Sequence, residues 1–178
     1  MSAASASAAT DPDWPDRLYD LLREQDVTQF CYVPDAGHGR LIDRALADPA
    51  VHAVPLTTEE EGVALAAGAH LGGARAVLLQ QSSGVGNCIN MLSLPRGARF
   101  PFLTLVSMRG EFGEGNPWQL PMGQSVRPVL EACEIIVMTI EAPDEVEQTI
   151  DAAMTMAFNS GAPVAVLLSQ KLIGAKKF

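Results

Sequence analysis

Two spacings of apolar residues alternate along this chain. Leu18, Leu21 and Leu22 recur at intervals of three and four, which is typical of an amphipathic helix. Elsewhere the apolar residues form short continuous runs, which are typical of strands buried on both faces of a sheet. The pattern predicts strands at 30–33, 51–55, 76–79, 102–107, 135–139 and 163–168. It predicts helices at 14–25, 38–47, from about 59 onward, from 88 to about 94, 125–133 and 144–159.

Six strands that alternate with helices predict an α/β fold, with a doubly wound, mostly parallel sheet and helices on both faces. We expect a single domain over 13–172, preceded by a disordered tail at 1–12 and followed by a C-terminal tail at 173–178. Sheets of this kind bind ligands at the carboxyl ends of their strands. The unusual loops of this chain follow predicted strands, so we expect the binding site among them; they are 34–38, 56–61, 80–87 and 108–123.

Charge and composition narrow the range of partners. The 178 residues include 12 Lys and Arg against 21 Asp and Glu, a net charge of −9, which argues against nucleic acid and anionic membranes. No apolar run is long enough for a membrane span, and the Ser/Ala-rich start does not read as a signal peptide. Cys31, Cys88 and Cys133 have no spacing typical of disulfides or metal sites, and we interpret them as reduced, buried thiols. These features predict a cytoplasmic protein.

Three acids stand before a run of small residues in the segment 57–69. Thr57 or Thr58 can cap a helix there, and acids in its first turn suit the positive end of the helix dipole. The small residues that follow allow the helix to pack closely, so an acid at its start can be buried with it. Burial is one way in which proteins tune a carboxylate for proton transfer. The alternative is an ordinary helix start with no further role.

The segment 80–87 ends a predicted strand and leads into a helix. Its small residues let backbone N–H groups approach a ligand, but it lacks a third glycine at Ile89 and a Gly-Lys-Ser/Thr sequence. It therefore matches neither nucleotide-binding fingerprint, and a tight strand–helix turn is the alternative. The long segment 108–123 contains Gly-Glu-Gly-Asn at 113–116, which we interpret as a flexible loop. We expect it to become ordered when a cofactor or partner binds.

His38, Arg109 and Gln119 are candidates for contacts with an anionic ligand, because they lie in or after loops at strand ends. The alternatives are a structural His and an exposed Arg, which are the commoner outcomes. The sequence shows no nucleophile elbow and no His-rich metal set, so we predict no metal ligands in this chain.

Taken in order, four segments resemble the pyrimidine-binding domain of thiamine diphosphate enzymes. The likeness is closest to the alpha subunits of sulfopyruvate decarboxylase and to the matching half of phosphonopyruvate decarboxylase. It spans about residues 15–170, and its segments are 58–69, 81–87, 109–111 and 119–123. The glutamate-led helix and the Ser-Gly-Val-Gly-Asn segment are fairly specific when they occur together.

The resemblance implies a catalytic glutamate, nine positions before a glycine of the small-residue helix. Counting back from Gly68 leads to Glu59, with Glu60 and Glu61 in the same cluster. In this family the glutamate bonds N1′ of the cofactor's aminopyrimidine and so promotes proton removal from the thiazolium ring, after which a 2-oxo acid loses CO2. The resemblance also implies that the cofactor contacts include Ser83, Gly84, Val85 and Asn87.

The family's magnesium and diphosphate site, a Gly-Asp-Gly followed by an Asn, is missing from this chain. The resemblance therefore implies a separate beta subunit that binds Mg²⁺ and the diphosphate, with thiamine diphosphate at the interface of a hetero-oligomer. It suggests 3-sulfopyruvate as the substrate, giving sulfoacetaldehyde and CO2, with His38, Arg109 and Gln119 as candidate contacts. Phosphonopyruvate decarboxylation, a carboligase reaction and a non-catalytic assembly or regulatory role are the alternatives.

Overall fold

The computed structural model describes residues 14–175, so the predicted tail at 1–12 and residues 176–178 lie outside the described part of the chain. Six strands form one sheet in the order β2-β1-β3-β4-β6-β5, and every neighbouring pair is parallel. The strands are β1 (Val27–Tyr32), β2 (His52–Pro55), β3 (Arg75–Gln81), β4 (Phe102–Ser107), β5 (Ile136–Ile140) and β6 (Pro163–Leu168). The predicted parallel, six-stranded sheet is confirmed.

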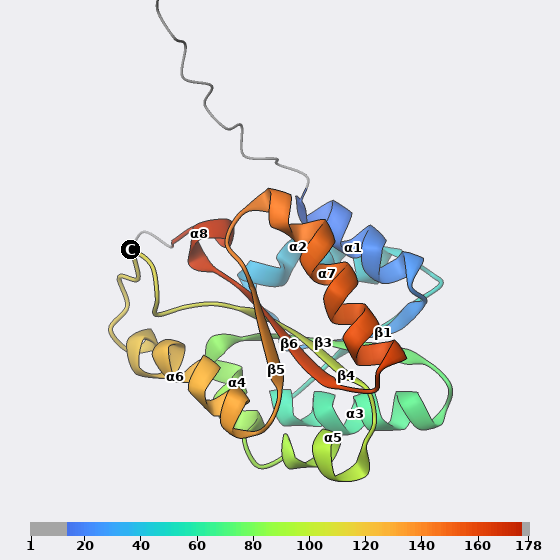
Figure 1. Ribbon diagram of the computed structural model, residues 1–178. Coiled ribbons are helices and arrows are strands. Elements are labelled where there is room, and N and C mark those ends of the chain that lie inside the picture. The colour runs from blue at the N-terminus through green and yellow to red at the C-terminus, as the bar shows by residue number, and fades with distance from the viewer. Residues whose placement is uncertain (1–13, 176–178) are drawn as a thin grey trace, which may run out of the picture.

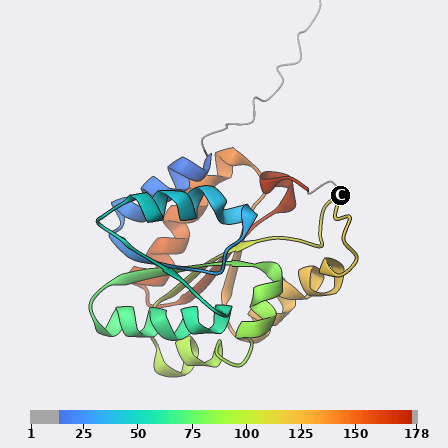
Figure 2. The ribbon, with the colours of Figure 1, turned by 180° about the vertical axis from the view of Figure 1, so that it is seen from behind.

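Helices cover both faces of the sheet (Figures 1 and 2). One face carries α1 (Trp14–Glu24), α2 (Gly39–Ala47) and α7 (Val146–Met154). The other carries α3 (Glu59–Leu71), α4 (Ser82–Cys88) and α6 (Gln119–Ala132), and α5 (Ser93–Ala98) packs against α3 on the same side. Successive strand residues enter opposite cores, so Val77 joins the α1 side and Leu78 the α3 side. This two-sided burial explains the continuous apolar runs of the sequence.

Short helical turns complete the chain. They are η1 (Ala36–His38), η2 (Pro143–Glu145), η3 (Thr155–Asn159) and α8 (Gln170–Ile173). The first follows β1, and α8 follows β6 at the same edge of the sheet. Together η2, α7 and η3 form the helix that the sequence predicts at 144–159.

Several predicted boundaries are wrong, chiefly where polar or small residues lie within a strand or a helix. β3 continues to Gln81, two residues beyond the predicted end, and within it the buried Gln80 amide donates to the Thr104 hydroxyl at 2.9 Å. The predicted loop after it is the helix α4, and the predicted helix at 88–94 is interrupted by a turn at 89–92 that separates α4 from α5. α6 begins at Gln119 rather than at 125. Pro121 falls in its first turn, where a helix tolerates proline. β1 likewise starts at Val27, three residues before the predicted strand.

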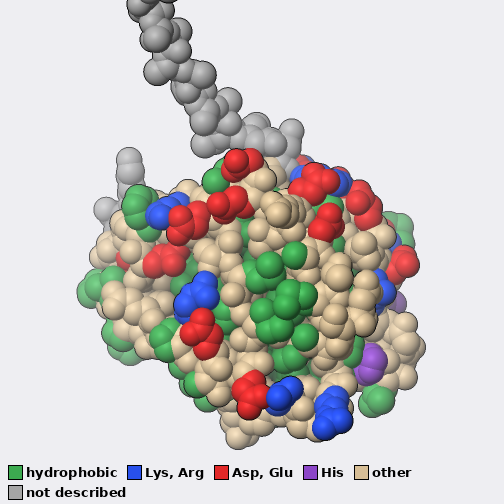
Figure 3. Space-filling view, in the orientation of Figure 1, with side chains coloured by type: hydrophobic (Ala, Val, Ile, Leu, Met, Phe, Trp, Pro, Cys, Tyr) green, Lys and Arg blue, Asp and Glu red, His purple; other side chains and the backbone are tan. Residues whose placement is uncertain are grey.

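The surface view shows acidic side chains gathered along its upper edge and a hydrophobic patch near its centre, where Figure 1 places the edge strand β5 (Figure 3). The thiols of Cys31 and Cys88 are buried, and burial raises the pKa of each to about 12. Cys133 is only half-buried, so the expectation of three buried thiols is wrong for it. Over residues 14–175, no helix is both long enough and apolar enough to cross a membrane.

The order of the strands places a crevice at one point of the sheet. After β1 the chain moves outward to β2 and then returns to β3 on the other side of β1. Ligands of doubly wound sheets bind at such a reversal, beyond the carboxyl ends of the two inner strands. Asp35 follows β1 and Gln81 ends β3, so these two side chains meet at the reversal.

Candidate functional site at the carboxyl ends of the strands

Glu59 is the first residue of α3, which begins just after β2. Of the three adjacent acids only Glu59 is buried, with 8 % of its surface exposed, while Glu60 and Glu61 are exposed. The Asn87 amide donates to its carboxylate oxygen Oε2 at 2.7 Å. Within residues 14–175, the other oxygen, Oε1, accepts no hydrogen bond. The carboxylate is thus held by one oxygen and presents the other.

Gly84 of α4 makes room for this carboxylate. A Cβ atom at that position would lie 2.5 Å from the Cδ and Oε1 atoms of Glu59. The glycine is therefore required by the approach of α4 to α3, and not by a flexible loop. The prediction of a loop at 80–87 is wrong because tertiary contacts stabilise a helix whose residues have weak helix propensity.

The N-terminus of α3 is not capped by a threonine hydroxyl, contrary to the sequence prediction. Thr58 is the N-cap residue, but its hydroxyl makes no capping hydrogen bond. Instead the Glu61 carboxylate accepts from the Thr57 backbone N–H at 2.8 Å. Close packing of the small-residue helix occurs at Gly62, where a Cβ would collide with Leu78, whereas a Cβ at Gly68 would meet nothing within 4 Å.

Asp35 is the centre of a second polar cluster, which sequence reasoning missed. Its Oδ1 accepts from the Gln81 amide at 2.9 Å, and its Oδ2 accepts from the Ser107 hydroxyl at 2.5 Å and the Gly37 backbone N–H at 3.1 Å. Burial alone would raise the pKa of Asp35, but these hydrogen bonds and the nearby His38 hold it below its ordinary value. The signal for this cluster was positional: three polar side chains at the ends of the adjacent strands β1, β3 and β4.

The cluster continues from Gln81 to the start of α6. The Gln81 side-chain oxygen accepts from the Ser83 hydroxyl at 3.1 Å and from the Gln119 amide at 3.2 Å. Ser83 and Gly84 are neighbours on α4, so this cluster adjoins the Glu59 site along the same helix. The structure thus brings the predicted residues Glu59, Ser83, Gly84, Asn87 and Gln119 to one region. Val85 differs, because its side chain is fully buried in the core.

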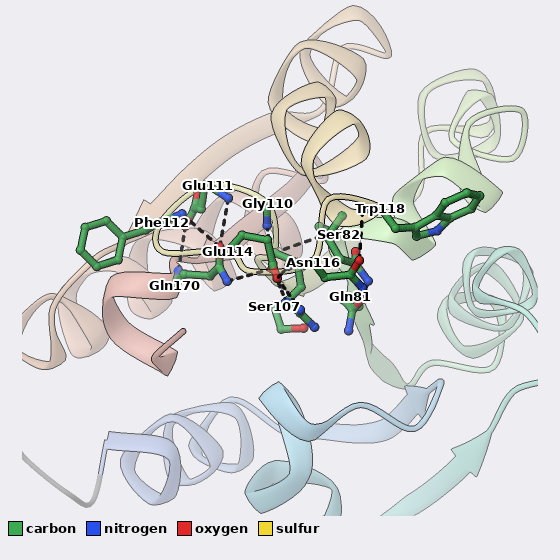
Figure 4. A network of polar contacts seen from close by, with 12 residues as sticks. Gln81, Ser82, Ser107, Gly110, Glu111, Phe112, Glu114, Asn116, Trp118 and Gln170 are labelled. Carbon is green, nitrogen blue, oxygen red and sulfur yellow. Dashed lines mark hydrogen bonds and ion pairs between the residues drawn. The ribbon is translucent and has the colours of Figure 1, made fainter. Parts of the chain in front are cut away.

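The segment from Arg109 to Asn116 is fastened by a buried network (Figure 4). The Arg109 guanidinium forms a two-pronged ion pair with Glu114 at 2.6 and 2.7 Å, and these side chains are 8 % and 1 % exposed. The hydrogen bond from Arg109 lowers the pKa of Glu114 to about 2. The Glu114 carboxylate also accepts from the backbone N–H groups of Gly110 and Asn116.

Gln170 of α8 joins the same network from the far end of the chain (Figure 4). Its side-chain oxygen accepts from the backbone N–H groups of Glu111 and Phe112, each at 3.0 Å. Its amide donates to Glu114 at 3.2 Å. The expectation of a flexible loop that orders on binding is therefore wrong for this segment, because buried hydrogen bonds already hold it. Phe112 and Trp118 nevertheless point outward, with 53 % and 83 % of their surfaces exposed.

The structure places two of the predicted substrate contacts away from the surface. His38 is fully buried, its Nε2 lies 3.1 Å from the Gln80 carbonyl oxygen, and burial lowers its pKa. A neutral ring that donates to this carbonyl is a structural element of the sheet end. The Arg109 side chain is paired with Glu114, and its backbone N–H donates to the Ser82 hydroxyl at 3.2 Å. His38 is therefore enclosed by the protein, whereas Arg109 is held by Glu114 at the wall of a small cavity.

A small cavity opens at this edge of the sheet. It has a volume of about 210 Å³ and is lined by Asp35, Ala36, Gly37, Ser107, Arg109, Ile173 and Gly174. Pockets for ligands of cofactor size usually have about 300–1,000 Å³, so the cavity is only part of such a site. A larger cavity of about 840 Å³ lies at the opposite edge, beside the first residues of β5 and β6. The described residues contain no group of three His, Cys, Asp or Glu side chains that could hold a metal ion.

Sequence comparison identifies relatives of nearly the same length. The chain is similar to the sulfopyruvate decarboxylase subunit alpha of Methanococcus maripaludis, with 36 % identity over 152 residues that cover 85 % of this chain and 91 % of that protein. This chain belongs to the family of sulfopyruvate decarboxylase alpha subunits. A phosphonopyruvate decarboxylase of Streptomyces viridochromogenes is 33 % identical to this chain over 150 residues, which cover 83 % of this chain and 38 % of that protein. No protein-family model matches the chain.

The fold of this alpha-subunit family member also occurs within a larger enzyme. The structure is similar to 2-oxoglutarate:ferredoxin oxidoreductase from Magnetococcus marinus, determined with 2-oxoglutarate, coenzyme A and succinyl-CoA bound. The match has a TM-score of 0.74 and 17 % sequence identity, and it covers 97 % of this chain and 33 % of that chain. At this identity the likeness shows the fold, and it confirms the α/β architecture that the sequence predicts.

Proposed function

We propose that this chain is the alpha subunit of a two-chain, thiamine diphosphate-dependent decarboxylase that converts 3-sulfopyruvate to sulfoacetaldehyde and CO2. The observation that carries the proposal is the buried Glu59 carboxylate, which lies against Gly84 and is held by Asn87. Membership of the sulfopyruvate decarboxylase alpha-subunit family supports the substrate.

The residues around Glu59 fit the aminopyrimidine end of thiamine diphosphate. A carboxylate with one bonded and one presented oxygen can share a proton with a ring nitrogen, and Gly84 leaves that oxygen uncovered. We therefore assign the pyrimidine contacts to Glu59, Gly84 and Asn87, with Ser83 beside them on α4. The buried Val85 side chain supports this helix and is not part of the assignment.

When bound, thiamine diphosphate supplies the electron sink that the loss of CO2 from a 2-oxo acid requires. The role of Glu59 is to hold and return a proton at Oε1, as a general acid–base group. Asn87 fixes the carboxylate through Oε2, so that Oε1 keeps its direction. The close approach of α3 and α4 excludes water from one side of the carboxylate.

The same structure supports the need for a beta subunit. The cavity at the strand ends is smaller than a cofactor, and the described residues offer no metal-binding group. The relative from Streptomyces viridochromogenes extends well beyond the part that this chain matches, as expected for a protein that carries both halves in one chain. We propose that the partner supplies the Mg²⁺ and diphosphate site. We also assign the sulfonate contacts to the partner, because His38 is buried and Arg109 is paired with Glu114.

The test is a decarboxylation assay of the chain reconstituted with its beta subunit, thiamine diphosphate and Mg²⁺. Replacing the acid in Glu59→Gln should lower turnover by about 10²–10⁴-fold, the usual contribution of a general acid–base group. The matched control is Glu60→Gln, which changes the exposed neighbour and should retain activity. Full activity of Glu59→Gln would overturn the assignment of this residue.

Phosphonopyruvate is the second candidate substrate, because a phosphonopyruvate decarboxylase is among the relatives. Comparing kcat/KM for 3-sulfopyruvate and phosphonopyruvate in the same complex distinguishes the two. A higher value for phosphonopyruvate would replace the proposed substrate, and no decarboxylation of either would overturn the proposed reaction.

A further inference from the structure

Asp35, Gln81 and Gln119 form a chain of side-chain hydrogen bonds across the end of the sheet. The Gln81 amide donates to Asp35 Oδ1 at 2.9 Å, and the Gln119 amide donates to Gln81 Oε1 at 3.2 Å. The three residues come from the loop after β1, the end of β3 and the start of α6. In both hydrogen bonds the donor lies on the side of Gln119 and the acceptor on the side of Asp35. We call this shared donor-to-acceptor direction the polarity of the hydrogen-bond chain.

The Asp35 carboxylate sets that direction. An ionised carboxylate only accepts hydrogen bonds, so Gln81 must turn its NH2 group toward Asp35 and its oxygen away from it. That oxygen then requires donors, which are the Ser83 hydroxyl at 3.1 Å and the Gln119 amide. Asp35 itself is held by donors on its other oxygen, from Ser107 and Gly37.

The chain ends on an unsatisfied acceptor. Because Gln119 gives its NH2 group to Gln81, its own oxygen Oε1 faces the other way. This oxygen is buried and has no hydrogen-bond partner within residues 14–175. Buried polar atoms in folded proteins almost always have a partner. Gln81 directly precedes α4, which carries Ser83 and Gly84, so the acceptor belongs to the region of the Glu59 site.

We propose that Asp35 is a positioning residue that, acting through Gln81, makes Gln119 an acceptor for an N–H or O–H donor of the bound ligand. The identity of the ligand rests on the proposed function, whereas the polarity of the chain does not. This reverses the sequence-based expectation that Gln119 donates to an anionic group of the substrate. Ionised carboxylate and sulfonate groups have no donor to offer. The donor is therefore the amino group of the cofactor's pyrimidine, or a hydroxyl group on a hydrated form of substrate or product.

The polarity can be reversed by one substitution. In Asp35→Asn, the new amide oxygen accepts from Ser107 and Gly37, and its NH2 group faces Gln81. Gln81 then turns over, and Gln119 follows and presents an NH2 group to the ligand. The Ser83 hydroxyl can rotate to accept instead of donating. The volume of the side chains hardly changes.

The first test measures thermal unfolding of the full-length protein and needs no ligand. Gln119→Glu places a carboxylate against the oxygen of Gln81 and should lower Tm, whereas in the Asp35→Asn background the reversed Gln81 donates to that carboxylate. We expect the loss of Tm caused by Gln119→Glu to be smaller in the Asp35→Asn background by at least about 2 °C. Equal losses in the two backgrounds would overturn the coupling between Asp35 and Gln119.

The second test measures ligand binding in the complex with the beta subunit. Asp35→Asn should weaken thiamine diphosphate binding about tenfold if the donor is the cofactor's amino group, or raise KM about tenfold if it is a substrate hydroxyl. The double variant Asp35→Asn/Gln119→Glu should restore the cofactor affinity or the KM, whichever Asp35→Asn changed. One oxygen of the carboxylate introduced at position 119 accepts from Gln81, and its second oxygen again accepts from the ligand. A merely structural role of Asp35 would not produce this rescue.

The control is Asp43→Asn, the same substitution at an exposed position of α2, away from the Asp35 cluster and the cavity. It should change both constants much less than Asp35→Asn. Unchanged cofactor affinity and KM in Asp35→Asn would overturn the ligand role and leave the Gln119 oxygen to a water molecule. If the complex fails to decarboxylate either substrate, the unfolding test still reports on the polarity, so the two proposals fail separately.

Discussion

Asn87 donates a hydrogen bond of 2.7 Å to the carboxylate of Glu59, although 28 positions separate them along the chain. The bond joins the last turn of α4 to the first residue of α3. It orients the one acid of the cluster that is buried. The orientation of the proposed proton-transfer group thus depends on a residue from a different helix.

Removing the amide in Asn87→Ala should lower turnover of the reconstituted complex about tenfold or more, because a hydrogen bond to a charged group is worth about 1.5–3 kcal/mol. Steady-state kinetics measure this, with circular dichroism to verify the fold. The control is Asn90→Ala, an exposed asparagine just beyond α4. Equal kinetics in the two variants would contradict the orienting role of Asn87.

Adding one carbon at Gly84 should displace the Glu59 carboxylate. The Cβ of Gly84→Ala would lie 2.5 Å from carboxylate atoms, so Glu59 must move or α4 must shift. We expect a loss of turnover of at least about tenfold, comparable to the loss of a charged hydrogen bond. The matched control is Gly68→Ala on α3, where a Cβ meets nothing within 4 Å. That control should stabilise the chain by about 0.5–1 kcal/mol, as alanine does in a helix interior. Chemical denaturation and activity assays measure both.

The buried ion pair of Arg109 and Glu114 should dominate the stability of its segment. Glu114→Gln leaves the Arg109 charge buried without its counter-ion, which should lower the free energy of unfolding by about 3 kcal/mol. Urea denaturation measures this. Glu141→Gln is the control, because its ion pair with Lys171 is about half exposed, and such pairs contribute about 0–1 kcal/mol. Similar losses in the two variants would contradict the importance of burial.

The same pair predicts how stability depends on pH. The pKa of Glu114 is lowered to about 2 in the folded chain, against an ordinary value of 4.5. The unfolded chain therefore binds more protons between these values, so this contribution is present above pH 4.5 and is lost as the pH falls toward 2. Unfolding free energies measured across this range should fall less steeply in Glu114→Gln than in the wild-type chain. Identical slopes would show that Glu114 does not titrate with folding.

The strands were predictable because burial on both faces leaves continuous apolar runs, as in 163–168, where the predicted and observed strands coincide. The boundaries of α4 were not predictable, because Ser82, Gly84 and Gly86 are residue types with low helix propensity. Their helix depends on packing, such as that of Gly86 against the Met122 sulfur, 3.2 Å from where a Cβ would lie. Local sequence does not encode such contacts.

The candidate site divides in the same way. The sequence by itself determined the α/β class, the positions of the strand-end segments that carry the candidate chemistry, and the acidic cluster that contains Glu59. Only the tertiary structure decided which acid is buried, because burial depends on the approach of α4, and it also withdrew His38 and Arg109 from the surface. The Asp35–Gln81–Gln119 chain was invisible in the sequence, since its members lie up to 84 positions apart and meet only where β1, β3 and α6 converge. Hydrophobic periodicity records which residues are buried, whereas the direction of a hydrogen bond is set by the partner that folding brings to it.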